Sequence, residues 1–335
     1  MTRENNNKQF VAAGASNSDQ KSIFLPILLI AICMGIAFIA SLIDKFVYPF
    51  GGDLLSPFIS QVLILLAPAY LFMMILYPDR SQFAKIKGLG FHRIRAEHVF
   101  LIIFTSLFLI TTSLVLNICL GGVYDASKGF TLLGSFTAGV GEFTTSYPYL
   151  AIVYAVTPAI IEEALFRGLL YSQFSEKDEF FAIAITSVIS SAFAFTLGGF
   201  PAALLCALTY CFIRNVTGSL FSSVIVHFIF NLYGVFLQTN VAKYFISAQN
   251  TLLLIIIVIA AWLISSILFF SEAARIYRVK AERIAAGEEK SSLPSVSFKK
   301  LGVFLKDCLT YRPTMICAIV AAVFFVAVTA MGYFA

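Results

Sequence analysis

Long apolar stretches dominate this chain and decide what it can fold into. Most are close to the ~20 residues that an α-helix needs to cross the hydrocarbon core of a bilayer. In lipid such segments must be helical or closed into a barrel, because only then are their backbone hydrogen bonds satisfied internally. The sequence therefore predicts an all-α, polytopic bundle of about nine transmembrane helices, at Ile23–Ile43, Pro57–Tyr77, His98–Leu120, Tyr147–Leu170, Phe180–Leu197, Phe200–Ile213, Ser219–Gln238, Thr251–Phe270 and Pro313–Phe334.

Charged residues are too few for a soluble protein of this size. Asp, Glu, Lys and Arg make up 12% of the chain, against ~25% in soluble domains. Mean hydropathy is +0.90. The composition excludes a soluble enzyme, a coiled coil, a disordered chain and a nucleic-acid partner. It predicts a multi-pass protein of the cell membrane, surrounded by lipid.

The basic residues predict the orientation of the bundle. With the N-terminus inside, nineteen of the 23 Lys and Arg residues fall in inside segments and three fall outside, with Arg167 left within a span. Cytoplasmic loops of membrane proteins carry this excess of positive charge. The N-terminus is therefore predicted to lie inside.

Four regions follow from these spans. A helix is expected to extend the eighth span from Glu272 to Lys290, where the sequence is charged and rich in Ala. The predicted regions are a disordered cytoplasmic tail (1–22), three transmembrane helices (23–146), a core of four helices (147–238), and two transmembrane helices (239–335) joined by a basic cytoplasmic loop (271–312).

Three charged residues lie inside the fourth span, where charge is costly and often functional. Glu163 and Arg167 are four residues apart, so they share one helix face and can pair. Glu162 is turned by about 100° toward a different neighbour. Pro158 predicts a kink one turn earlier. The group is compatible with catalysis, with an ion pair that sets helix register, or with a proton relay.

A second polar pair lies in the seventh span. His227 and Asn231 are four residues apart and face the same way, and lipid does not solvate such a stripe. Glu162 and His227 each lie eight residues from the predicted inside boundary of their helix, or about 12 Å. The acids and the His stripe are therefore expected to meet at one depth.

These two clusters resemble motifs of the CPBP family of intramembrane proteases, which includes the CAAX prenyl protease of the Rce type and the bacterial Abi proteins. Glu162-Glu163-Ala-Leu-Phe-Arg167-Gly corresponds to the Glu-Glu-x-x-x-Arg motif, and His227 to Asn231 corresponds to His-x-x-x-Asn. The resemblance covers Tyr147 to Gln238. The middle Phe-x-x-x-His motif of the family has no counterpart, because Ser190 to Gly199 contains no His.

The resemblance implies a role for each matching residue. Glu162 would be the general base, supported by Glu163 and Arg167. His227 and Asn231 would stabilise the oxyanion. The family resemblance allows a divalent metal such as zinc, with Glu162 and His227 as ligands, but no cofactor is firmly implied because zinc sites use three protein ligands.

The leading hypothesis is an intramembrane endopeptidase that hydrolyses a peptide bond of a membrane-associated protein or peptide with glutamate-activated water. The absent middle His supports an alternative, a catalytically impaired CPBP-like membrane binding or immunity protein. A third reading is a small proton-coupled transporter that uses the acid pair as a relay.

Overall fold

The computed structural model describes residues 23–43, 61–78, 88–121, 147–175, 178–195, 200–237, 251–287 and 310–333, with positions 81, 302–303 and 306. Throughout these ranges the regular structure is helical and contains no strand. The fold is a helical membrane bundle. The predicted tail (1–22) and the segments 122–146, 239–250 and 291–300 lie outside the described residues.

The helices coincide with the nine predicted apolar stretches. Six are long and apolar enough to cross a membrane, and three, Val62–Leu76, Glu179–Ala192 and Leu220–Val235, are shorter. The number of crossings therefore stays a prediction. The helices are Ile23–Ile43; η2 and α3 (Val62–Leu66, Ala67–Leu76); η3 and α5 (Ala96–His98, Val99–Gly121); α7, η6, α8, η7 and α9 (Tyr147–Ala151, Ile152–Val156, Thr157–Glu162, Glu163–Leu170, Tyr171–Ser175); α10 (Glu179–Ala192); α11 (Phe200–Thr217); α12 and η8 (Leu220–Leu232, Tyr233–Leu237); α14 (Thr251–Ala285); and α16 (Arg312–Tyr333).

Some boundaries differ from the predicted ones. The fourth helix continues to Ser175, and α11 continues to Thr217 before Gly218 ends it with a φ of +67°. Glycine adopts this left-handed conformation at little cost, which makes it a common helix terminator. In contrast, α10 ends early, at Ala192, and Phe195 beyond it has a φ of +49°.

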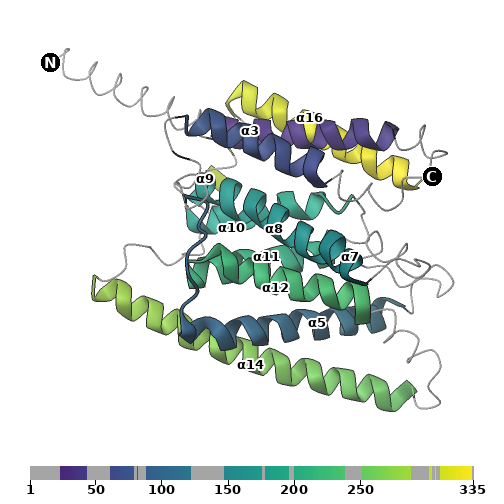
Figure 1. The fold of residues 1–335 in the computed structure, drawn as a ribbon, viewed down its shortest axis with the longest axis vertical. Coiled ribbons are helices and arrows are strands. Elements are labelled where there is room, and N and C mark those ends of the chain that lie inside the picture. Colours follow the sequence, from purple (N-terminus) through teal and green to yellow (C-terminus); the bar gives the residue numbers. More distant parts are fainter. Residues whose placement is uncertain are drawn as a thin grey trace.

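The helices of residues 147–237 form the middle of the bundle (Figure 1). Helix Ile23–Ile43, α3 and α16 lie on one side of this middle layer, and α5 and α14 lie on the other. Phe108 of α5 stacks on Phe269 of α14, with ring centroids 4.7 Å apart. Thr111 and Ser265 share a hydrogen bond of 2.7 Å between the same helices, a polar contact typical of helix pairs in lipid.

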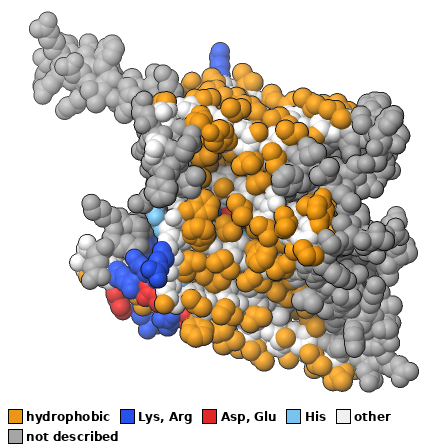
Figure 2. All heavy atoms as spheres, viewed as in Figure 1, with side chains coloured by type: hydrophobic (Ala, Val, Ile, Leu, Met, Phe, Trp, Pro, Cys, Tyr) orange, Lys and Arg blue, Asp and Glu red, His pale blue; other side chains and the backbone are white. Residues whose placement is uncertain are grey.

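The outer surface of α14 is apolar along its first part and charged along its last part. Exposed side chains such as Leu252, Ile256, Leu263 and Ile267 give it a face suited to lipid. Figure 2 shows hydrophobic side chains over the visible face, with Lys, Arg, Asp and Glu gathered at one end. The helix runs unbroken through Glu272 to Ala285, so the predicted extension of the eighth span is confirmed to that residue.

Segments predicted to be inside meet at this charged end. Arg283 of α14 donates two hydrogen bonds to Glu97, at 2.7 and 2.9 Å, although the two residues are 186 positions apart. Ser219, at the start of α12, donates to the backbone carbonyl of His92. These contacts require the loop before α5, the turn before α12 and the end of α14 to lie on one side of the bundle.

Candidate active site

The two acids lie where the fourth helix changes its hydrogen-bonding pattern. Glu162 is the last residue of α8, and Glu163 is the first residue of the π-helical segment η7. A second π-helical segment, η6, precedes α8 and ends at Val156, two residues before Pro158. The interruption expected from Pro158 therefore takes the form of a π-helical turn. Such turns are frequent at functional sites because they redirect the side chains that follow.

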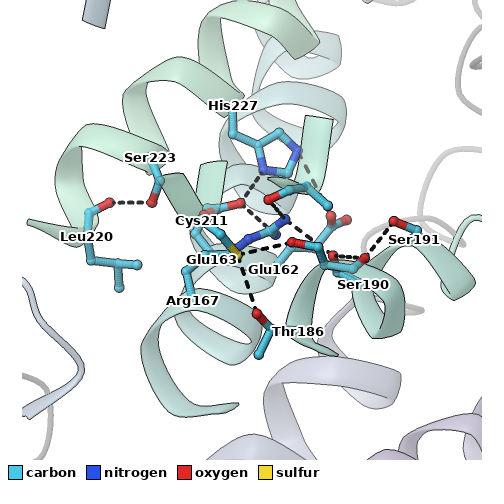
Figure 3. A network of polar contacts seen from close by, with 12 residues as sticks. Glu162, Glu163, Arg167, Thr186, Ser190, Ser191, Cys211, Leu220, Ser223 and His227 are labelled. Carbon is cyan, nitrogen blue, oxygen red and sulfur yellow. Dashed lines mark hydrogen bonds and ion pairs between the residues drawn. The ribbon is translucent and has the colours of Figure 1, made fainter. Parts of the chain in front are cut away.

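Glu163 is the centre of a buried ionic network. Its carboxylate accepts a hydrogen bond of 2.9 Å from Arg167 Nη1 and one of 3.0 Å from His227 Nδ1, both at Oε1. The Glu163 side chain is 0% exposed and that of Arg167 is 2% exposed. Figure 3 shows the side chains of Glu163 and Arg167, from one helix, and of His227, from a neighbouring helix, pointing toward one another. The fourth and seventh spans are thus joined at the depth where their polar residues occur.

Arg167 is held from its other side by α10 and α11. Its Nη2 donates to Ser190 Oγ and to the carbonyl of Ala207, each at 3.2 Å. The guanidinium also lies over the Tyr210 ring, 5.2 Å from its centroid. A buried Arg keeps its charge, so several acceptors are needed to replace its lost hydration. Arg167 therefore ties α10 and α11 to Glu163.

The motif ends in Gly168, and the packing around this residue explains why it is a glycine. Gly168 lies against the loop before α5 and the start of α12, where a Cβ atom would meet Leu89 Cβ at 3.2 Å and Leu220 Cδ2 at 3.3 Å. Any larger side chain would push these segments apart. The glycine therefore permits the close approach of α12, which carries His227.

The serines of α10 are engaged in structural contacts. Ser190 accepts from Arg167 and donates to the carbonyl of Ser187, and Ser191 donates to that same carbonyl. Thr196 lies outside the described residues. The polar side chains near the place of the missing middle His thus support Arg167 and the helix backbone.

Glu162 points away from this pair, as its position on the helix predicts. It accepts a hydrogen bond of 3.1 Å at Oε1 from Gln61 Nε2, at the start of η2. Its Oε2 lies 3.9 Å from His227 Nε2, and its side chain is 23% exposed. Glu162 is thus the more accessible of the two acids. Sequence reasoning missed Gln61, although a lone amide in an apolar span is itself a signal.

His227 has one nitrogen bound and one facing Glu162. An ionised carboxylate only accepts hydrogen bonds, so Nδ1 is the donor to Glu163, and an imidazole with its one N–H at Nδ1 has its lone pair on Nε2. The ring stacks on Tyr210, with centroids 4.6 Å apart and planes inclined by 17°. Glu163 and Tyr210 therefore fix the direction in which Nε2 points.

Asn231 follows His227 by one helical turn on α12 and is half-buried. Within the described residues its side-chain amide has no recorded hydrogen bond. The structure therefore brings Glu162, Glu163, Arg167 and His227 into one network and leaves Asn231 beside it.

The side chains present do not fit a zinc site. Glu162 and His227 Nε2 could serve as two ligands, but Glu163 is committed to Arg167 and to His227 Nδ1. Among the described residues no group of three or more His, Cys, Asp or Glu could hold a metal ion. Zinc sites use three protein ligands, and the described side chains around Glu162 and His227 supply two.

A comparison with known families found a match, which covers the segment that carries the candidate site. Residues 144–233, about a quarter of the chain, match the model of the type II CAAX prenyl endopeptidase Rce1-like family. Comparisons with curated proteins and with solved structures found no match. The matched segment contains both polar clusters and excludes Gln61. Over residues 144–233 this chain is similar to the Rce1-like type II CAAX prenyl endopeptidases, which supports the resemblance to the CPBP intramembrane proteases.

Proposed function

We propose that this protein hydrolyses a peptide bond of a membrane-associated protein or peptide, with Glu162 as the general base. The observation that carries the proposal is the approach of Glu162 Oε2 to His227 Nε2, at 3.9 Å. This separation is too long for a direct hydrogen bond and short enough for both atoms to contact one water molecule.

The reaction follows from that placement. A water molecule donates one hydrogen bond to Glu162 Oε2 and the other to His227 Nε2. Glu162 takes a proton as the water oxygen attacks the carbonyl carbon of the substrate. The carbon–nitrogen bond then breaks, and Glu162 returns the proton to the leaving amine. The products are a new carboxylic acid, which releases its proton to become a carboxylate, and a new amine, and Glu162 is regenerated.

His227 and Asn231 have different roles in this proposal: His227 positions the water, and Asn231 stabilises the oxyanion. His227 Nε2 donates a hydrogen bond only when the ring is doubly protonated, so the geometry favours a role in holding the water over the oxyanion role that the resemblance implies. Asn231 carries an amide donor one turn away and has no recorded partner in the described part of the chain. We assign the oxyanion to Asn231, because a donor fixed in a dry site stabilises developing negative charge.

The proposal is tested by reconstituting the purified protein in liposomes with membrane-anchored reporter peptides, half of them prenylated near the C-terminus. In water enriched in ¹⁸O, mass spectrometry is expected to find one heavy oxygen in the new carboxyl group. Cleavage of the prenylated peptides alone would define the substrate class. Absence of cleavage across the panel would count against the proposal.

Asn231→Ala is expected to lower kcat by roughly 10²- to 10³-fold, the usual effect of removing one oxyanion donor. KM should change little, because the lost hydrogen bond forms mainly in the transition state. Ile225→Ala, a change on the exposed part of the same helix, is the matched control. Equal activity of the two variants would remove Asn231 from the site.

A catalytically impaired relative is the second candidate, favoured by the absence of His from residues 190–199. It would bind a membrane partner with the same fold and cleave nothing. In that case the wild-type protein and Glu162→Gln would behave alike in every assay.

A further inference from the structure

Gln61 is the polar residue of the site that comes from outside the matched segment. It lies at the start of η2, 101 positions before Glu162, and donates from Nε2 to Glu162 Oε1 at 3.1 Å. The assignment of the amide is unambiguous, because a carboxylate accepts hydrogen bonds and only the NH₂ end of Gln donates them. The second span therefore reaches directly to the proposed base.

The hydrogen bond from Gln61 gives the two carboxylate oxygens of Glu162 different neighbours. Oε1 is held by Gln61, and Oε2 faces His227 Nε2. Without a partner on Oε1, the carboxylate could rotate about its terminal torsion, which is broad in Glu. Gln61 thus selects the orientation in which Oε2 faces the water position.

The other end of the Gln61 amide is unusual. Its Oε1 atom is buried and has no hydrogen-bond partner among the described residues. A buried acceptor without a donor is costly, so an amide that served only to join two helices would be expected to satisfy both ends. The unsatisfied carbonyl of Gln61 therefore favours a role for this amide in holding Glu162 over a role in joining two helices.

We propose that Gln61 is a positioning residue for the general base Glu162, supplied by the second span. The inference rests on the proposed function, since it assigns Gln61 a part in the same reaction. It extends the site beyond residues 144–233 and gives the N-terminal helices a part in catalysis.

The chain offers a matched control for this proposal. Gln173 Nε2, in α9, donates to Tyr77 Oη at 2.9 Å and so joins the same two spans at another level. Gln173→Met and Gln61→Met each remove one interhelical hydrogen bond and keep the side chain about the same length. A purely structural contribution of Gln61 would make the two variants alike.

The experiment measures kcat and KM for both variants in the reconstituted cleavage assay, with thermal midpoints measured in detergent. Gln61→Met is expected to lose up to about 10²-fold in kcat with little change in KM, the scale of loss that a misplaced catalytic group produces. Gln173→Met should retain wild-type kcat. Gln61→Asn, which keeps the amide on a shorter side chain, is expected to recover part of the loss.

The outcomes separate the two proposals. Equal kcat values for Gln61→Met and Gln173→Met, in a wild-type protein that cleaves and a Glu162→Gln variant that does not, would overturn only the role of Gln61. A kcat for Gln61→Asn no higher than that for Gln61→Met would also count against it. Absence of cleavage by the wild-type protein would overturn the proposed function itself.

Discussion

Glu162→Gln is expected to reduce peptide cleavage by about 10²- to 10⁴-fold, the usual contribution of a general base. The amide has almost the same shape as the carboxylate but takes no proton from water at neutral pH. Its carbonyl oxygen can still accept from Gln61, so the local structure should persist. The measurement is kcat/KM in proteoliposomes, accompanied by the thermal midpoint of the variant in detergent.

The control for this change is Glu282→Gln, which removes an exposed acid at the charged end of α14. It should leave cleavage and the thermal midpoint close to wild type. Undiminished cleavage by Glu162→Gln would show that another group activates the water. A large fall in its thermal midpoint would instead identify Glu162 as a structural residue.

Arg167→Met is expected to cost about 3–5 kcal/mol of stability, the penalty for removing one partner of a buried ion pair. The change leaves the Glu163 side chain, which is 0% exposed, without its Arg partner while His227 Nδ1 still donates to Oε1. It also frees Ser190 Oγ and the carbonyl of Ala207 from their shared donor. Equilibrium unfolding in detergent micelles would measure the loss.

The pair formed by Arg275 and Glu272 on α14 supplies the comparison: the nitrogen and oxygen are 2.6 Å apart, and the Arg275 side chain is 48% exposed. Arg275→Met should change stability little, because solvent screens such a pair. If Arg167→Met were no more destabilising than Arg275→Met, the buried network would not hold the helices together. If Arg167→Met lost activity but kept its full stability, Arg167 would have a part in the reaction itself and not only in holding the helices together.

The positions of the helices could be predicted from the sequence because lipid imposes a simple rule. A segment such as Ile23–Ile43 is apolar over the length of a bilayer crossing, and the described residues 23–43 are helical throughout. The ends of some helices were harder to predict from the sequence. The end of α10 at Ala192 and the extension of α11 to Thr217 depend on local backbone conformation, which hydropathy does not record.

The site was predictable in part for a similar reason. Charge inside a span marked Glu162, Glu163 and Arg167, and the four-residue spacing predicted the pair that forms between Glu163 and Arg167. Matching depth predicted that His227 would lie near the acids. Helical periodicity describes one helix at a time, however, and leaves open which nitrogen of His227 faces which acid.

By itself the sequence determined the class of the protein, the depth of its polar residues and the pairing within the fourth span. Each of these follows from local spacing and from the cost of charge in lipid. Only the tertiary structure decided that Glu163 binds Nδ1 of His227, that Nε2 faces Glu162, and that Gln61 contacts Glu162 from 101 residues away. Such contacts depend on how separate helices pack and rotate against one another, and no single helix encodes that arrangement.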